Sequence, residues 1–169
     1  MTASIAKGRN TPRLLVIGVG NEFRSDDGVG LRIARELTSL LPPDTKIIQG
    51  SGEGASLIES WNGFDIVIII DAVKSGALPG RIHRIDASAR TIPVNFFNYS
   101  SHAFSVAEAI EVSRALGSLP SALIIYGIEG KSFSNGTELT PEVLQSAGEV
   151  KKLILDEIKA LTAKVAVTK

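Results

Sequence analysis

The sequence predicts a single α/β domain, a three-layer α/β/α sandwich built on a five-stranded, mostly parallel sheet with one antiparallel strand. Continuous runs of branched apolar residues, without polar alternation, are typical of parallel strands that are covered on both faces. Segments with helical periodicity separate these runs. A length of 169 residues suits one domain with one buried core.

Five segments are predicted to be strands. The three apolar runs are residues 14–17, 66–70 and 122–126, and a weaker strand, expected nearer an edge, covers residues 45–49. Residues 80–86 alternate polar and apolar residues, and only the short loop 74–79 separates them from the preceding run. Because so short a loop permits a hairpin but no helical crossover, this segment is expected to be the antiparallel strand.

Four segments show helical periodicity. They are residues 29–40, 55–61, 104–116 and 141–161. Pro42, Gly63 and Gly117 end the first three, and Pro141 stands near the start of the fourth. The elements then follow one another as β-α-β-α-β-β-α-β-α.

The domain is expected to span residues 13–162, between a flexible leader, residues 1–12, and a loose tail, residues 163–169. The leader is polar and lacks the apolar stretch of a signal peptide. The longest apolar run, residues 66–70, is too short to cross a bilayer, so no membrane insertion is expected.

Composition excludes several classes of function. The 18 basic and 18 acidic residues cancel, so no overall field favours nucleic acid. The absence of cysteine excludes a thiol nucleophile, a thiolate zinc site and disulfide bonds, and it makes the cytoplasm the expected compartment.

The expected topology places two loops at one site. Ligands bind open α/β sheets beyond the carboxyl ends of the strands, where the strand order reverses. Right-handed crossovers make the first strand the pivot, with the second strand on one side and the third on the other. The loop after residue 17 and the loop after residue 70 therefore flank one crevice, and they deliver Asp27 and Asp71 to it.

The first of these loops has three interpretations. Gly18 and Gly20 suggest a dinucleotide-binding turn, but the third glycine of that motif is replaced by Phe23, and two adjacent aspartates would repel a phosphate. Asp26 and Asp27 can instead cap the following helix. In the third interpretation one of them caps while Asp27, beside Gly28, points outward into the crevice.

Asp71 follows five branched apolar residues, where a carboxylate is costly unless it is paired, hydrogen-bonded or bound to a metal. The structural alternative is that it braces the neighbouring loop.

The two histidines are expected to differ. His83 lies on the alternating strand and is expected on its solvated face. His102 is expected to open the third helix, with Ser100 or Ser101 as N-cap. Because a helix N-terminus disfavours the imidazolium ion, His102 should stay neutral and available as a ligand.

A serine triad is not supported, because the Gly-x-Ser-x-Gly motif is absent and His102 is the one candidate base. Asp27, Asp71 and His102 instead form a ligand set for a borderline divalent ion with open positions.

Four features occur in order along the chain. They are the loop Gly18-Val-Gly-Asn-Glu-Phe-Arg-Ser-Asp-Asp-Gly-Val-Gly30, Asp71-Ala72 after an apolar run, Ser101-His102 at an expected helix start, and Gly127-Ile-Glu129 ahead of Leu139-Thr-Pro141. Over roughly residues 14–155 the chain thereby resembles the [NiFe]-hydrogenase maturation endopeptidases. The resemblance implies a phosphorylase/hydrolase-like α/β sandwich.

The resemblance also implies a function. Such a protease removes a short C-terminal peptide from the precursor of the hydrogenase large subunit after nickel insertion. The nickel, supplied by the precursor, serves as the recognition signal. The family's metal-binding triad corresponds to Asp27, Asp71 and His102, although some members have glutamate where this chain has Asp27.

Two further residues are candidates for substrate binding. Asn21 can donate a hydrogen bond to the substrate or stabilise its own turn, and Glu129 can face the crevice or cap a turn. The loop that begins at Gly127 is more similar to the branch that serves soluble or cofactor-reducing hydrogenases.

Two other functions are considered. One is a non-catalytic, nickel-dependent binding or chaperone domain on the same fold. The other is a peptidyl-tRNA hydrolase, which shares the Gly-x-Gly-Asn opening but requires a basic face and a histidine soon after it, and this chain has neither.

Overall fold

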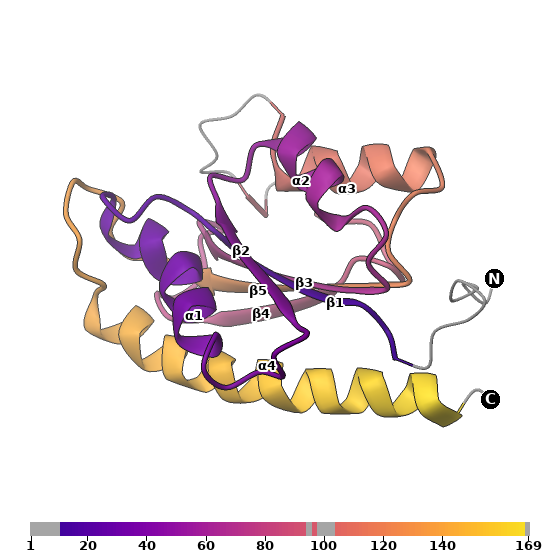
Figure 1. The fold of residues 1–169 in the computed structure, drawn as a ribbon. Coiled ribbons are helices and arrows are strands. Elements are labelled where there is room, and N and C mark those ends of the chain that lie inside the picture. Colours follow the sequence, from indigo (N-terminus) through magenta and orange to yellow (C-terminus); the bar gives the residue numbers. More distant parts are fainter. Residues whose placement is uncertain (1–10, 94–95, 98–103, 168–169) are drawn as a thin grey trace.

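A five-stranded sheet in the order β2-β1-β3-β5-β4 forms the middle layer of the molecule (Figure 1). The computed structural model describes residues 11–93, 96–97 and 104–167. The strands are β1 (Leu14–Val19), β2 (Lys46–Gly50), β3 (Ile66–Val73), β4 (Ile82–Asp86) and β5 (Ala122–Glu129). The expected sandwich with one antiparallel strand is confirmed.

The apolar runs form the centre of the sheet, as expected. Every residue of β1 and β3 is buried, and β1 pairs in parallel with β2 on one side and β3 on the other. This confirms β1 as the pivot where the strand order reverses. The weaker strand β2 lies at the edge and begins with the exposed Lys46.

β4 is antiparallel, as predicted, but the expected hairpin with β3 is wrong. β4 pairs with β5, and β5 lies between β4 and β3. The burial of the two strands explains this order. β5 is buried along nearly its whole length, so an interior position covers both of its faces, whereas the partly polar β4 tolerates the edge.

Two pairs of helices cover the two faces of the sheet (Figure 1). One face packs against α1 (Val29–Leu37) and α4 (Pro141–Val167), and the other against α2 (Gly54–Trp61) and α3 (Val106–Ala115). Successive residues of β3 point to opposite faces, so Ile68 belongs to the first core and Ile69 to the second. A short 3₁₀ helix, η1 (Ser25–Gly28), leads into α1.

Two helix boundaries differ from the expected ones. α3 begins at Val106, where Ser105 and Glu108 form a capping box, so the expected start near His102 with Ser100 or Ser101 as N-cap is wrong. α4 continues to Val167, so much of the tail that was expected to be loose is helical. Residues 1–10 of the predicted leader lie outside the described residues.

No helix in the described part of the chain has the length and apolar character needed to cross a bilayer.

Candidate active site

Close backbone packing brings the loop after β1 against β3. Gly20 has φ +147°, and a Cβ atom there would lie 1.8 Å from the carbonyl oxygen of Asp27. A Cβ atom on Gly30, at the start of α1, would lie 2.2 Å from the carbonyl oxygen of Ile70. Only glycine allows these approaches. They set the segment that carries Asp27 beside the strand position just before Asp71.

Asp71 is a buried carboxylate within β3. The strand does not end before it, as the sequence suggested, but continues to Val73, because β3 pairs with β5 as far as Glu129. The side chain is on the α2/α3 face, by alternation with Ile69, and the residue is 8% exposed. Burial raises the pKa of Asp71 well above its usual value, and the negative charge of Asp27 raises it further.

Asp27 shares this low-dielectric environment. Burial raises its pKa, while the positive charge of Arg24 and a hydrogen bond from the backbone N–H of Asn21 to Oδ2, 3.1 Å long, act in the opposite direction. The half-buried Asp27 and the buried Asp71 therefore form a pair of carboxylates whose negative charges repel each other. Such a pair is stabilised by a shared proton or by a divalent cation.

The structure thus brings together two of the three predicted metal ligands. His102 lies outside the described residues. Within residues 11–93, 96–97 and 104–167, no group of three His, Cys, Asp or Glu side chains could hold a metal. The donor set of two carboxylate residues fits a divalent cation that brings further ligands of its own.

Asn21 stabilises the turn that holds Asp27. Its Oδ1 accepts a hydrogen bond from the backbone N–H of Phe23, 2.9 Å long, and its own N–H donates to Asp27. These contacts match the turn-stabilising alternative. A hydrogen bond from the exposed Asn21 amide to substrate stays a prediction.

Glu129 caps the turn between β3 and β4. Its carboxylate accepts hydrogen bonds from the N–H and Oγ of Ser75, both 2.8 Å long, and from the N–H of Gly76, 3.0 Å long. The residue is 2% exposed. Of the two alternatives for Glu129, these contacts correspond to turn capping, and direct binding of substrate stays a prediction.

His83 is not on a solvated face, and this expectation is wrong. Its side chain is 19% exposed, Nε2 lies 3.3 Å from Oε2 of Glu129, and its ring meets the ring of Phe96 edge to face. The reason lies in the spacing of the two isoleucines. Ile82 and Ile85 are three residues apart and face opposite sides, so His83 shares the buried side with Ile85.

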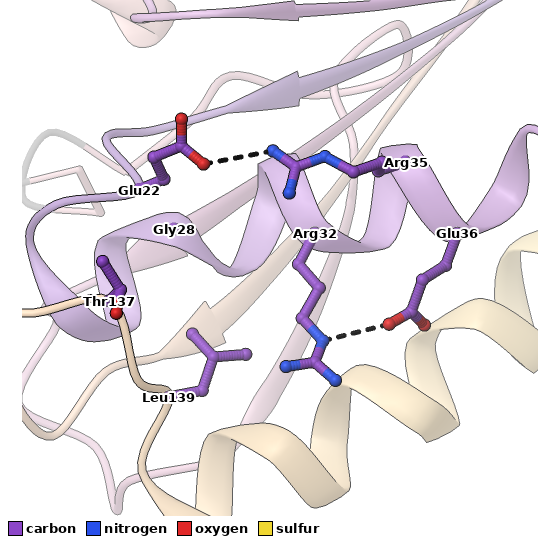
Figure 2. Close-up of a pocket in the computed structure, with 7 residues that line it drawn as sticks. All are labelled: Glu22, Gly28, Arg32, Arg35, Glu36, Thr137 and Leu139. Carbon is purple, nitrogen blue, oxygen red and sulfur yellow. Dashed lines mark hydrogen bonds and ion pairs between the residues drawn. The ribbon is translucent and has the colours of Figure 1, made fainter.

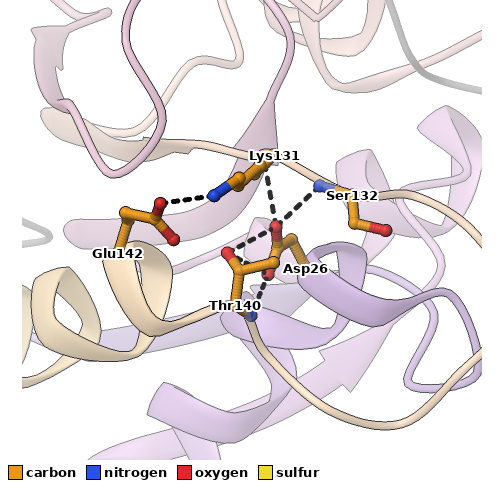
Figure 3. Close-up of polar contacts among 5 residues, drawn as sticks. All are labelled: Asp26, Lys131, Ser132, Thr140 and Glu142. Carbon is orange, nitrogen blue, oxygen red and sulfur yellow. Dashed lines mark hydrogen bonds and ion pairs between the residues drawn. The ribbon is translucent and has the colours of Figure 1, made fainter.

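Asp26, next to Asp27, has an entirely different role (Figure 3). It is fully buried, and its carboxylate accepts hydrogen bonds from the backbone N–H groups of Lys131 (2.8 Å), Ser132 (2.9 Å) and Thr140 (2.7 Å). The Thr140 hydroxyl donates to it as well. Asp26 therefore fastens the β5–α4 loop to the segment that carries Asp27.

The two aspartates do not cap their own helix, since neither η1 nor α1 has a side-chain cap hydrogen bond. Sequence reasoning missed the long-range role of Asp26, because a doubled aspartate before a glycine does not reveal which of the two points inward.

A polar cavity of about 410 Å³ lies along α1, next to the same loop (Figure 2). Two of its ion pairs join Arg35 to Glu22, at 3.3 Å, and Arg32 to Glu36, at 3.0 Å. Since α1 covers the face opposite to the Asp71 side chain, this cavity is separate from the carboxylate pair.

The chain is similar to a group of known proteins. A family model described as hydrogenase maturation protease matches residues 31–157, a span that begins four residues after Asp27 and includes Asp71 and His102. The hydrogenase 2 maturation protease of Escherichia coli is 31% identical over 135 residues, which cover 78% of this chain and 81% of that protein.

Two further matches agree. The hydrogenase expression/formation protein HupD of Thiocapsa roseopersicina is 25% identical over 138 residues, 80% of this chain but only 62% of that longer protein. The solved structure of the hydrogenase maturating endopeptidase HybD from E. coli superposes with a TM-score of 0.75 at 27% identity, covering 88% of this chain and 93% of that one.

Proposed function

Because the chain belongs to the hydrogenase maturation protease family, we propose that it is a metal-dependent endopeptidase with one defined substrate. It removes a C-terminal peptide from the nickel-loaded large-subunit precursor of a [NiFe]-hydrogenase, in the cytoplasm. Family membership supports the cleavage of a hydrogenase subunit. That the substrate is the nickel-loaded precursor, and that cleavage takes place in the cytoplasm, is our proposal.

The pair of shielded, mutually repelling carboxylates is the observation that carries the proposal. The pKa values of Asp27 and Asp71 are both raised, so placing a negative charge on both carboxyl groups has an electrostatic cost. A divalent cation that arrives with the substrate relieves this cost, whereas a substrate without the cation does not. Affinity therefore depends on the metal state of the precursor.

We propose that Asp27, Asp71 and His102 bind the nickel of the precursor and thereby align the scissile peptide bond. A water molecule then attacks the scissile carbonyl carbon, the C–N bond breaks, and the nitrogen of the released peptide takes up the proton that the water gives up. A carboxylate of this pair with a raised pKa is suited to accept the proton of the attacking water near neutral pH. Either the nickel or a carboxylate of the pair that is not bound to it lowers the barrier to this attack.

Mass spectrometry of the precursor tests the proposal. The protein is incubated with purified large-subunit precursor, either nickel-loaded or nickel-free. We expect loss of a C-terminal peptide from the nickel-loaded form alone. A stable complex with an intact nickel-loaded precursor would instead support a non-catalytic binding or chaperone domain.

Two variants serve as controls. Asp71→Ala and His102→Ala should leave the precursor intact while the far-ultraviolet circular dichroism spectrum of each variant stays that of the wild type. Cleavage by either variant would remove that residue from the site.

A further inference from the structure

Arg24 lies three residues before Asp27 and begins the turn that presents it. The N–H of Asp27 donates a hydrogen bond, 3.2 Å long, to the carbonyl oxygen of Arg24. A four-residue turn closed in this way brings the Cα atoms of its two ends within about 7 Å of each other. Arg24 is also partly buried. Its long side chain therefore starts beside the carboxylate pair.

Among the described residues, Arg24 is the one cation whose charge acts on either carboxyl group of the pair. Its positive charge lowers the pKa of Asp27, against the effect of burial. Lys74, three residues after Asp71, has a different neighbour. Its Nζ lies 5.9 Å from the ring centroid of Phe133, which packs against the α1/α4 core. The positive charge thus reaches the pair from Arg24, on the side of Asp27.

The backbone on both sides of Arg24 is fixed to the β5–α4 loop. The carbonyl oxygen of Phe23 accepts a hydrogen bond from the N–H of Gly136, 3.0 Å long, and the N–H of Ser25 donates to the carbonyl oxygen of Gly136, 2.8 Å away. Ser25 is the one described residue other than glycine with a positive φ, +51°. Such a conformation persists only where the surroundings enforce it, and it is common at functional sites.

A positive charge beside Asp27 opposes the proposed binding of nickel, since like charges repel. If the loop had only to bind a cation, an uncharged residue would serve better than Arg24. Peptide hydrolysis offers a reason for the charge. When water attacks the scissile carbonyl carbon, an electron pair of the C=O bond moves to the oxygen, which becomes negative. A guanidinium group, with its planar array of N–H donors, suits this oxygen.

We propose that Arg24 is a further catalytic residue: its guanidinium group donates a hydrogen bond to the scissile carbonyl oxygen and stabilises the negative charge that forms there. The inference rests on the proposed function and adds the group that binds the oxyanion. When the electron pair returns to the carbonyl, the C–N bond breaks and the peptide nitrogen takes up the proton from the water. Arg24 keeps its own protons throughout.

Steady-state cleavage of the nickel-loaded precursor by Arg24→Met and Arg24→Lys tests this inference. Arg24→Met keeps an unbranched side chain without the charge or the donors, and its kcat should fall about 100-fold or more. Arg24→Lys keeps the charge but not the planar donor array, and its kcat should fall about tenfold. KM should stay the same or decrease for Arg24→Met, because the repulsion of nickel is removed. Guanidinium chloride, added below its unfolding range, should partly restore the kcat of Arg24→Met.

Arg32→Met is the matched control. Arg32 is half-exposed on α1, pairs with Glu36 and lines the cavity that is separate from the carboxylate pair (Figure 2). This variant should cleave the precursor with unchanged kcat, and added guanidinium should not increase its rate.

The outcomes separate the two claims. If the wild type leaves the nickel-loaded precursor uncut, the proposed function is wrong and the inference with it. If the wild type cleaves and Arg24→Met has the same kcat, the inference alone is overturned. A higher KM at unchanged kcat also overturns it, because Arg24 would then only position Asp27 for nickel. If Arg24→Met melts well below the wild type, Arg24→Lys decides, and a wild-type kcat for Arg24→Lys overturns the inference.

Discussion

The neighbouring residues Asp26 and Asp27 have opposite effects on stability. Asp26 accepts hydrogen bonds from three backbone N–H groups in a partly buried setting, whereas burial raises the pKa of Asp27. Asp26→Ala leaves these donors without an acceptor, at a cost of about 1–3 kcal/mol for each donor that stays buried. We expect Asp26→Ala to lower the free energy of unfolding by at least about 3 kcal/mol, measured by urea denaturation.

Two comparisons make this prediction specific. Asp27→Asn should abolish cleavage without loss of stability. Glu142→Ala, which removes an ion pair with Lys131 near the same loop, should change the free energy of unfolding far less than Asp26→Ala, because exposed ion pairs contribute little. Equal losses in Asp26→Ala and Glu142→Ala would show that the Asp26 hydrogen bonds do not hold the loop.

Asp71 makes stability depend on pH. Its pKa in the folded protein lies above the value in the unfolded chain, so the folded state holds the proton more tightly. Its unfavourable contribution is therefore absent below about pH 4 and grows as pH rises toward the folded-state pKa. We expect Asp71→Asn to melt at a higher temperature than the wild type at pH 7.5, by about 2–4 °C for each kcal/mol that the charge costs.

The same variant should lose this advantage as pH falls toward 4, because the wild-type carboxyl group is then neutral as well. Calorimetry at several pH values measures the difference. An advantage that is constant from pH 4 to pH 7.5 would mean that the charge of Asp71 is not its source. Asp71→Asn should be inactive at every pH.

At the scale of elements, the β3–β4 turn is held by a buried carboxylate. Glu129 binds Ser75 and Gly76, and His83 binds Glu129 and packs on Phe96. We expect His83→Ala to lower the free energy of unfolding by about 1–2 kcal/mol through loss of the ring contact and the hydrogen bond. Cleavage should remain, because His83 is not part of the predicted triad.

Urea denaturation and precursor cleavage are measured together for this prediction. Arg81→Ala is the control, since the exposed Arg81 lies just before the same strand. An inactive but stable His83→Ala protein would contradict the assignment of the site to Asp27, Asp71 and His102.

The helices and strands show how much of the fold can be predicted from the sequence. Residues 66–70 predicted a central strand because an unbroken apolar run has few other places in a soluble fold. The pairing of β4 was not predictable in the same way, because a short loop limits the direction of a strand but not which neighbour it takes. Its neighbour is set by where β5 must be buried, which is a property of the assembled sheet.

The same distinction holds for the site. The predicted topology alone placed Asp27 and Asp71 at one site. It made β1 the strand where the strand order reverses and placed β3 beside it, so that the loop after β1 and the end of β3 meet. The hydrogen bonds of Asp26 with Lys131 and of Glu129 with Ser75 join residues more than 50 positions apart, and the local sequence pattern does not indicate such pairs. The start of α3 differs from the predicted one because several serines precede the helix, and Ser105 is the one that forms a capping box with Glu108.

The whole molecule has two apolar cores, one on each face of a shared sheet. Because β1, β3 and β5 contribute to both, we expect the cores to unfold together. Trp61, the one tryptophan, lies in the α2/α3 core, so its fluorescence reports that face, whereas circular dichroism is dominated by all four helices including the long α4. The two transitions in urea should coincide.

Ile68→Ala sharpens this prediction. Ile68 lies in the α1/α4 core, and its truncation should cost about 2–5 kcal/mol. The Trp61 signal on the opposite face should shift by the same amount as the circular dichroism signal. Separate midpoints would show that each face unfolds by itself.

The link from Asp26 to the β5–α4 loop has a consequence for synthesis. It joins residues 105 to 114 positions apart, so the segment that carries Asp27 gains its support only after Thr140 has left the ribosome. A nascent chain that has made β1 and β3 already holds both carboxylates, yet lacks the brace that orders one of them. The hydrogen bonds of Asp26 therefore form only after the β5–α4 loop has been synthesised, later than β1 and β3.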